Sequence, residues 1–408
     1  MINTNKPKIA FLGNNITPGG GSASLYLLVK SINSSAFDKY VYASTCRSEE
    51  MKNNFLKHCH KVTVVELDEI CSCQTFDTPN SEFEKIKKRS DKLSKQFLDI
   101  LLHEKIDILH LNNSVFSHVT EYVKNNSSIK IISHVRELVN HNGIGELQKF
   151  ILQRITNFSD KIIAISDNEA EMFPDSDKLT IMANPFDFSG LNQIVPNFRK
   201  NNHVSEDTVL VAMMGRFNYH KGHLEFLKVL KTIIDKKAVN QNFKFMIIGA
   251  SLHQALWKRI AKKMLGRFDY INAVSNFIKE NKLQDKLILI PYTQNVLQIV
   301  RDVDIMVRPS LHGDPWGRDI IEAMALSKPL VATGNSSFYI KDGYTGFLVP
   351  LKNTEFFAQK ISELMNDREK RIEFGKNGFE KISGMCDLTG YGLEIEKMYL
   401  GLMKIYQC

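Results

Sequence analysis

The stretch RPSLHGDPWGRDIIEAMALSKPLVAT, residues 308–333, joins two short apolar segments through a helix. An apolar strand is expected to end at Arg308, and an apolar helix is expected over Arg318–Ser327. Pro329 prevents this helix from continuing, and a second strand is expected to end at Thr333. A strand, a helix and a further strand in this order are typical of a parallel sheet covered by helices.

The same alternation of short apolar segments and amphipathic stretches runs along almost the whole chain. In the first half, the apolar segments rich in Ile, Val or Leu are Lys8–Gly13, Val41–Thr45, Lys61–Leu67, Ile106–Leu111, Ile129–Ser133 and Lys161–Ser166. In the second half they are Thr208–Met214, Phe243–Gly249, Lys286–Ile290, Asp304–Arg308 and Pro329–Thr333. Such segments predict buried strands, and the patterns Ser24–Ser31 and Ser81–His103 between them predict helices. The expected fold class is α/β, with two Rossmann-like, doubly wound domains.

The alternation of strands and helices is interrupted near Asn184, and this interruption divides the chain of 408 residues into two domains. Asn184–Asp187 predicts a turn, since the residue before a proline avoids the helical conformation, and a polar stretch follows. A final helix over Leu393–Tyr406 is long enough to return to the first domain. The expected boundaries are a first domain over 1–190, a hinge over 191–207, a second domain over 208–385 and a C-terminal helix over 386–408 that packs on the first domain.

Composition and charge narrow the classes of function. The chain is 43% apolar and 24% charged, and no apolar run approaches the ~20 residues of a membrane-spanning helix. The polar start, Met1–Lys8, predicts that no secretory signal is present, and the six cysteines are expected to be free thiols in a reducing cytoplasm. The net charge of +8 favours anionic partners, but the chain shows no RNA-binding signature or long basic tract, so nucleic acid is not expected.

A glycine-rich segment follows the first predicted strand. Asn14–Gly21 reads NNITPGGG, and a helix is expected from about Ser22. Glycines let the backbone approach a phosphate closely, and a helix N-terminus offers free N–H groups to it. The spacing is not that of the dinucleotide fingerprint, and no acidic residue ends the second strand. A flexible turn with a helix cap at Ser22 is the alternative interpretation.

Two basic residues follow the first strand of the second domain. Arg216 and Lys221 lie in GRFNYHKG, residues 215–222, on the loop between a strand and a helix. A guanidinium supplies a planar fork and an ammonium supplies a point charge, and together they suit a diphosphate. A solvated surface is the alternative, but ligands in open α/β sheets bind beyond the carboxyl ends of strands. The position of the loop therefore favours a binding site.

Two acids stand eight residues apart in the stretch quoted first. Asp314 lies on the loop, Glu322 lies one turn into the helix, and the helix N-terminus at Gly317–Arg318 lies between them. Carboxylates accept hydrogen bonds from vicinal hydroxyls, so one acid would hold a sugar and the other a ribose. A capping acid and a helix-surface glutamate are the alternative. Because the helix around Glu322 is otherwise apolar, its carboxylate needs a partner.

Taken in order, these segments resemble the family 4 glycosyltransferases. The segments are PGG and SHVRE in the first half, GRF…KG and RPS…DPWGRDIIEAMA in the second, with Asn184–Pro185 and DGYTGFLVP near Asp342. The resemblance spans about Lys8 to Pro350. It implies the GT-B fold, in which two Rossmann-like domains, one for the acceptor and one for the donor, face each other across a cleft.

The resemblance also implies roles for particular residues. In the second domain, Arg216 and Lys221 would hold the donor diphosphate, Glu322 would hold the ribose hydroxyls, and Asp314 would lie near the transferred sugar. Donor contacts are further expected at Gly317 and Arg318 and, for the base, at Tyr292, which follows the strand Lys286–Ile290. In the first domain, Gly20 would approach the phosphate, and His134, after the strand Ile129–Ser133, would touch the donor sugar. The catalytic residues expected are His134, Arg216, Lys221 and Asp314.

The activity implied is transfer of a hexose or N-acetylhexosamine, with retention of configuration, from a UDP- or GDP-sugar to a glycan or lipid-linked acceptor in bacterial surface polysaccharide synthesis. No metal or other cofactor is expected, because the two cations would balance the charge of the diphosphate. Three features depart from the family pattern: Asp314 replaces a glutamate, Pro315 follows it, and Gly334–Tyr339 replaces a Gly-Gly-Pro-Glu-like stretch.

Other functions stay open at this point. A GT-B protein that binds a nucleotide sugar or glycan without transfer is the main alternative. A nicotinamide-dependent oxidoreductase would need the missing fingerprint, and a phosphorylase would need a pyridoxal lysine that we cannot identify.

A basic stretch suggests a membrane partner. Residues 82–95, EFEKIKKRSDKLSK, place six basic residues on a helix whose apolar stripe is Phe83, Ile86, Leu93 and Phe97. Such a helix would rest on an anionic membrane face, which makes the expected protein cytoplasmic and peripheral on the inner face. A solvated helix packed on its own sheet is the alternative, and Trp257–Phe268 has the same ambiguity.

Overall fold

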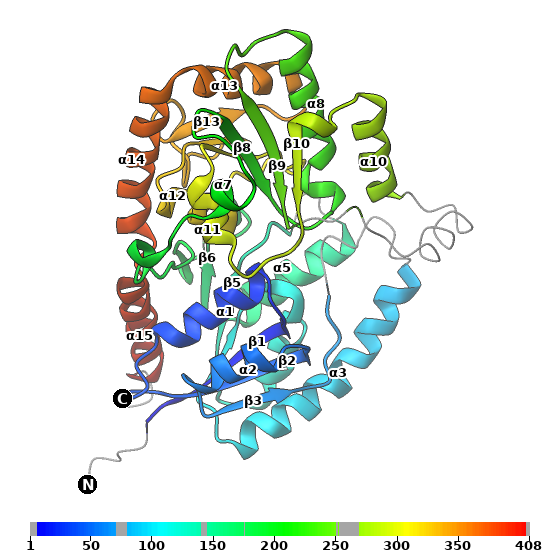
Figure 1. The fold of residues 1–408 in the computed structure, drawn as a ribbon. Coiled ribbons are helices and arrows are strands. Elements are labelled where there is room, and N and C mark those ends of the chain that lie inside the picture. The colour runs from blue at the N-terminus through cyan, green and yellow to red at the C-terminus, as the bar shows by residue number, and fades with distance from the viewer. Residues whose placement is uncertain are drawn as a thin grey trace. The chain divides into compact units, whose positions relative to one another are not determined.

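The computed structural model of the chain describes residues 6–70, 80–139, 145–174, 176–249, 252 and 269–404, without the side chains of 80–87 and 404. The chain forms two compact units (Figure 1). The first unit combines Met1–Asp187 with Cys386–Cys408, and the second is Phe188–Met385.

The first unit is built on a seven-stranded sheet in which every pairing is parallel. Its strands are β1 Lys8–Ile16, β2 Asp38–Cys46, β3 Lys61–Val64, β4 Ile108–Leu111, β5 Lys130–Val135, β6 Lys161–Ala164 and β7 Leu179–Ile181. Their order is β3-β2-β1-β4-β5-β6-β7, so the direction of winding reverses between β1 and β4. Ligands of open α/β sheets bind beyond the carboxyl ends of the strands at such a point.

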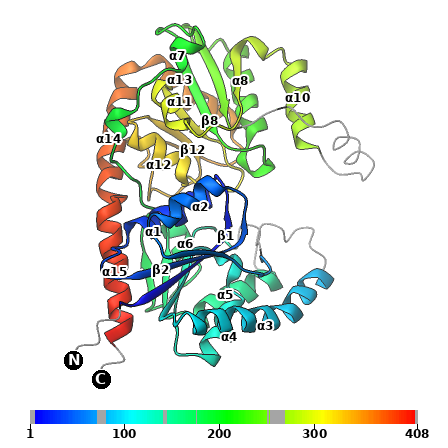
Figure 2. The same cartoon turned by 60° about the horizontal axis from the view of Figure 1, so that its bottom comes forward.

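Helices cover both faces of this sheet. They are α1 Gly20–Ser31, α2 Glu49–Leu56, α3 Asn80–His103, α4 Val119–Asn126, α5 Glu146–Phe158, α6 Asp167–Ala170 and α15 Leu388–Lys404, with a 3-10 turn at Ser114–Phe116. On one face, Leu28 of α1 and Ile395 of α15 pack with Phe11 of β1, and α15 contacts α1 (Figure 2). On the other face, Phe97 of α3 and Val123 of α4 pack with Leu109 of β4. Buried on both faces, the strands read as continuous apolar runs.

The second unit is a six-stranded parallel sheet with the order β10-β9-β8-β11-β12-β13. Its strands are β8 Val209–Met214, β9 Phe243–Ile248, β10 Leu287–Ile290, β11 Ile305–Arg308, β12 Leu330–Thr333 and β13 Gly346–Val349. Its helices are α7 Phe198–Asn201, α8 His223–Asp235, α10 Tyr270–Glu280, α11 Val296–Asp302, α12 Arg318–Ala325, α13 Thr354–Asn366 and α14 Arg368–Met385, with 3-10 turns at Leu191–Gln193, Tyr219–Lys221 and Gln284–Lys286. Here the winding reverses between β8 and β11.

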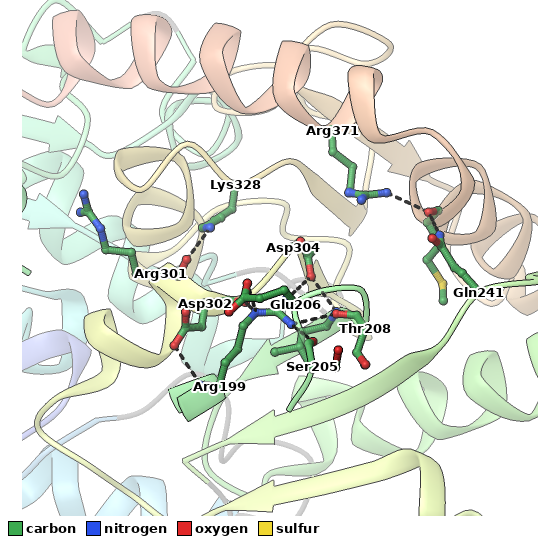
Figure 3. A network of polar contacts seen from close by, with 12 residues as sticks. Arg199, Ser205, Glu206, Thr208, Gln241, Arg301, Asp302, Asp304, Lys328 and Arg371 are labelled. Carbon is green, nitrogen blue, oxygen red and sulfur yellow. Dashed lines mark hydrogen bonds and ion pairs between the residues drawn. The ribbon is translucent and has the colours of Figure 1, made fainter. Parts of the chain in front are cut away.

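The expected hinge, residues 191–207, packs inside the second unit. Arg199 is 7% exposed and donates to the carbonyl oxygens of Ser205 and Thr208 and to the carboxylate of Asp304 at 2.7 Å (Figure 3). The Asp304 carboxylate also accepts the backbone N–H of Leu210 at 2.8 Å. A buried guanidinium needs several hydrogen-bond acceptors, and Arg199 finds them next to the amino ends of β8 and β11. The network therefore connects residues 191–207 to these two strands.

The α/β fold class is confirmed. The structure extends the predicted strands Lys8–Gly13 and Val41–Thr45, and it shortens most of the others by one to three residues. Two strands, β7 and β13, were not predicted, since they are edge strands of three and four residues without a clear pattern. Among the described residues, Cys46 and Cys59 are free thiols, whereas Cys71, Cys73 and Cys408 lie outside them. No helix in the described part of the chain is both long and apolar enough to cross a membrane.

Candidate functional site

Two loops follow the two strands at which the second sheet reverses its winding. Residues 215–222 follow β8, residues 309–317 follow β11, and the two strands pair directly, with Met306 opposite Ala212. Their carboxyl ends therefore lie at one edge of the sheet. The predicted residues Arg216, Lys221 and Asp314 are carried by these loops.

Backbone contacts hold the two loops together. The carbonyl oxygen of His220 accepts the backbone N–H of Leu311 at 3.0 Å and the hydroxyl of Ser310 at 3.4 Å. The rings of His220 and His312 stack with their centroids 4.2 Å apart. Gly222 has φ of 76°, and a Cβ there would lie 1.8 Å from the carbonyl oxygen of Pro309. Only glycine allows this close approach, which fixes Lys221 beside the second loop.

Arg308, the last residue of β11, organises the second loop. Its side chain is 6% exposed. Nη1 donates to both carboxylate oxygens of Asp319 at 2.7 Å, Nη2 donates to Oδ2 of Asp314 at 2.6 Å, and Nε donates to the carbonyl oxygen of Asp314 at 2.6 Å. Burial alone would raise the pKa of the Asp314 carboxyl, but Arg308, with smaller contributions from Ser310 and Lys221, holds that pKa below its ordinary value. Asp314 is therefore an ionised group held by a neighbouring cation.

Lys221 is partly buried next to this cluster. The nearby charge of Arg308, followed by burial, lowers the pKa of Lys221, while Asp319 and Asp314 partly oppose that shift. Arg216 is exposed and adds a further positive charge that acts on Lys221. Without a bound anion, the ammonium is thus in a region where positive charges repel it. The addition of an anion would relieve this repulsion.

The helix α12 carries the second acid. Glu322 Oε1 accepts from Arg318 Nε at 3.2 Å and from Arg318 Nη2 at 3.1 Å, one turn earlier on the helix. Burial raises the pKa of Glu322, and Arg318 partly opposes that shift. Gly317 is the N-cap of α12, and a Cβ there would lie 2.7 Å from Asp319 Oδ1. Arg318 is thus the partner that we expected for the buried carboxylate of Glu322.

The structure thus brings together most of the residues predicted in the second unit. Asp319 links the two halves of the cluster, because it pairs with Arg308 and also acts on the pKa of both Lys221 and Glu322. Tyr292 follows β10, is 55% exposed, and makes no hydrogen bond with these residues in the part of the chain that the structure describes. β10 is an edge strand, separated from β8 by β9.

In the first unit, Gly20 and His134 occupy different environments. Gly20 is exposed at the first turn of α1, which follows β1. His134 lies within β5, not after a strand as expected, because the strand continues to Val135. Its side chain is fully buried on the face covered by α1 and α15, and its ring stacks on Tyr391 with centroids 6.5 Å apart.

Arg136, directly after β5, holds several groups at this end of the first sheet. Nε donates to the carbonyl oxygen and Oδ1 of Asn112 at 3.0 and 3.1 Å, Nη1 donates to Oδ1 of Asn184, and Nη2 lies 3.2 Å from Nδ1 of His134. Asn184 belongs to the predicted turn and Arg136 to the SHVRE segment. A single guanidinium therefore connects two segments that the sequence singled out separately.

The sequence did not identify Arg308, Asp319 or Arg136 as site residues. A signal was available for Arg308, since an arginine that closes the buried strand IMVR needs an acidic partner. The ten residues between Arg308 and Asp319 gave no indication of which acid it would be.

Comparisons with known proteins find a family match within the second unit. Residues 195–381 match the family model described as glycosyl transferases group 1. The chain is similar to the capsular polysaccharide biosynthesis glycosyltransferase CapM of Staphylococcus aureus, with 26% identity over 48% of this chain and 47% of that one, so it spans about half the length of this relative. It is also similar to the UDP-Gal:alpha-D-GlcNAc-diphosphoundecaprenol alpha-1,3-galactosyltransferase of Escherichia coli, with 20% identity over 74% of this chain and 78% of that one.

Among solved structures, Anabaena Alr3699/HepE in complex with UDP and glucose aligns with a TM-score of 0.76 and 17% identity, over 97% of this chain and 100% of that one. This likeness shows a common fold, with two Rossmann-like units of the GT-B class. The motifs, the two sheets and the matched residues agree: residues 195–381 match the group 1 glycosyl transferases, and the chain has the GT-B fold.

Proposed function

We propose that this protein is a retaining glycosyltransferase that moves a hexose or N-acetylhexosamine from a UDP- or GDP-sugar to a glycan or lipid-linked acceptor in bacterial surface polysaccharide synthesis. The donor nucleotide binds the second unit, at the loops after β8 and β11. Relatives named for capsule synthesis and for transfer from UDP-galactose support this choice of substrate class.

The observation that carries the proposal is the group of cations at the carboxyl ends of β8 and β11. Lys221 is partly buried beside Arg308, with its pKa lowered, and Arg216 lies on the same loop. When the bond between the sugar and the diphosphate breaks, negative charge builds on the diphosphate. Arg216, Lys221 and the N-terminus of α12 at Gly317–Arg318 would stabilise that charge.

The remaining predicted residues have roles that follow from their chemistry. Glu322, which pairs with Arg318, would accept hydrogen bonds from the ribose diol. Tyr292 would lie at the base. In the first unit, Gly20 at the start of α1 would approach the phosphate, and His134 would donate to the sugar. Asp314 would act on the transferred sugar through the loop that it anchors to Arg308.

The alternative is a protein that binds a nucleotide sugar without transferring it. The observation that favours it is that Asp314 already uses Oδ2 and its carbonyl oxygen to bind Arg308. The experiment is a thermal-shift screen against UDP, GDP and ADP, followed by detection of free nucleotide released from the matching sugars. We expect a shift with UDP or GDP and slow release of sugar to water. A nucleotide-dependent shift without any release, with a set of glycan and lipid acceptors present, would favour the binding protein.

Transfer is expected to be independent of divalent metal ions, because the cations of the two loops take their place. The triplet Asp302–Asp304 offers two carboxylates of the kind that bind Mg²⁺, but both interact with Arg199, at the opposite end of β11 from the cluster. Nucleotide release measured with excess EDTA should equal that of the untreated protein within about twofold. Loss of activity in EDTA and its recovery with Mn²⁺ would contradict metal independence.

A membrane-bound acceptor would bring the protein to an anionic surface through α3. Lys88, Lys92 and Lys95 are exposed, whereas Leu93 and Phe97 are buried in the core of the first unit. The described part of the apolar stripe therefore packs on the protein's own sheet, and attraction to the membrane would depend on charge. The side chains of Phe83, Ile86 and Lys87, like Trp257–Phe268, lie outside the described residues.

Changing these three lysines to glutamine should lower pelleting with vesicles that contain anionic lipid by about a hundredfold, at roughly 1 kcal/mol for each charge. The matched control changes three exposed lysines of the second unit, Lys228, Lys279 and Lys376, and removes the same net charge. Equal pelleting of both variants and the unmodified protein would reject the role of α3.

A further inference from the structure

A groove lies on the second unit between α8 and α13, two helices that pack against each other (Figure 1). Its volume is about 470 Å³, within the range of roughly 300–1,000 Å³ that is typical of small-molecule sites. Thr232 lines it from the last turn of α8, whereas Lys221 lies just before the first turn. Because α8 has 13 residues, which rise about 1.5 Å each, its two ends are about 20 Å apart. The groove is therefore separate from the candidate donor site.

Ser362 of α13 contributes a buried hydroxyl to the groove. Ser362 is 7% exposed, and its Oγ has no hydrogen-bond partner in the part of the chain that the structure describes. A serine in a helix can bond to the carbonyl oxygen one turn earlier, and Ser362 does not do so. A buried polar group without a partner is unfavourable unless a ligand or a water supplies one. The hydroxyl thus indicates that the groove holds a molecule with hydrogen-bonding groups.

The other polar groups of the groove include both donors and acceptors. Asn353 caps α13, since its Oδ1 accepts the backbone N–H of Phe356 at 3.0 Å, and its amide nitrogen remains to donate. Gln359 is exposed and can both donate and accept. Ile233 and Phe356 add apolar surface beside these groups. The polar residues that line the groove are Thr232, Lys236, Asn353, Glu355, Gln359 and Ser362.

The charges of the groove cancel. Lys236, directly after α8, forms an ion pair with Glu355 in the first turn of α13, and these are the two charged residues among those that line the groove. A site for a phosphate, a nucleotide or an acidic headgroup is expected to carry an excess of cations. Balanced charge, mixed donors and acceptors, and apolar surface suit an uncharged sugar, because its hydroxyls donate and accept while its C–H faces are apolar.

We propose that this groove is a second, non-catalytic binding site for an uncharged glycan. The choice of a glycan rests on the proposed function, since a protein that extends a polysaccharide meets such chains. A chain held here would keep its reacting end at a high effective concentration, without any contact between the groove and the reacting atoms.

The first test measures binding and needs no transfer activity. Saturation-transfer NMR is recorded with the full-length protein and two uncharged probes, maltohexaose and chitotetraose, with excess UDP and GDP present to occupy the donor site. We expect saturation transfer to at least one probe, and a Kd that rises about tenfold or more in Ser362→Leu, which fills part of the groove and removes the hydroxyl. Absence of transfer to both probes would overturn the proposal.

Two further proteins separate the groove from general damage to the fold. Ser383→Leu makes the same change on α14, where the hydroxyl donates to the carbonyl oxygen of Glu380, and should bind the probe like the unmodified protein. Thr232→Ala combined with Gln359→Ala removes polar groups without adding volume and should weaken binding about threefold or more. An unchanged Kd in this variant and in Ser362→Leu would overturn the proposal. Displacement of the probe by tripolyphosphate would also overturn it, because it would indicate an anion site.

The second test uses transfer. Ser362→Leu should raise KM for a polymeric glycan acceptor about threefold or more and leave the release of donor sugar to water unchanged, because the groove is distant from the loops 215–222 and 309–317. An unchanged KM would contradict a role of the groove in holding the acceptor chain. If the unmodified protein transfers no sugar at all, the proposed function fails, and the NMR measurement still decides whether the groove binds a glycan.

Discussion

Replacing Lys221 with methionine is expected to lower the rate of transfer by about 10²–10³ without lowering the thermal stability of the protein. The loss of rate follows from the removal of a preorganised cation at the diphosphate. The unchanged stability follows from the lowered pKa of Lys221, which shows that the folded protein without anion disfavours its charged form. A lysine whose folded pKa lies below its unfolded value destabilises the fold at pH values below the folded pKa, and this cost disappears as pH rises from the folded pKa to the unfolded one. Methionine removes the cost at every pH.

Transfer rate and melting temperature are the two measurements. The matched control is Lys228→Met on α8, which removes the same charge from an exposed position paired with Glu225 and should leave the rate unchanged. A Lys221→Met protein that keeps its rate within about threefold would show that Lys221 does not act on the diphosphate. A lower melting temperature with proportionate loss of rate would indicate a structural role instead.

Replacing Arg308 with methionine is expected to destabilise the second unit by about 3–5 kcal/mol. The change leaves two largely buried carboxylates, Asp314 and Asp319, without their shared partner, and each side chain is less than one fifth exposed. The loop 309–317 should lose its order, including Trp316, which is 4% exposed. In a Trp257→Phe background, Trp316 is the remaining tryptophan, so the urea midpoint of its fluorescence measures this region.

A double-mutant cycle distinguishes a shared ion pair from general damage to the core. Asp319→Asn in the Arg308→Met protein should restore part of the stability, since it removes one of the uncompensated charges. Additive losses in the two substitutions would contradict the central position of Arg308 in this cluster.

The sequence predicted those parts of the molecule that depend on local pattern. Apolar runs such as Lys8–Gly13 and Thr208–Met214 became strands because parallel strands are buried on both faces. The loop after a strand then indicated Arg216 and Lys221, since the loops that leave the carboxyl ends of parallel strands gather at one edge of the sheet. The requirement that Glu322 have a partner was also met, by a residue four positions away on the same helix.

The local sequence pattern could not predict contacts between segments that are far apart in the chain. Tyr399 and His110, which form a hydrogen bond, are 289 residues apart, and nothing in the sequence around either one indicates the other. Arg199 gave the segment 191–207 an anchor in the second unit that its polar composition did not suggest. The end of β5 was missed by two residues, because the polar His134 and the charged Arg136 interrupt the apolar run and so predicted an earlier end.

We propose that a nucleoside diphosphate binds the second unit through the cations of the two loops. The most direct test is calorimetric titration of UDP and of uridine, or of GDP and guanosine, into the unmodified protein and Lys221→Met. We predict that the diphosphate binds the unmodified protein far more tightly than the nucleoside, and that Lys221→Met weakens the diphosphate about 30-fold or more, roughly 2 kcal/mol, with little change for the nucleoside. Equal affinity of both proteins for the diphosphate, or equal affinity of the unmodified protein for diphosphate and nucleoside, would contradict it.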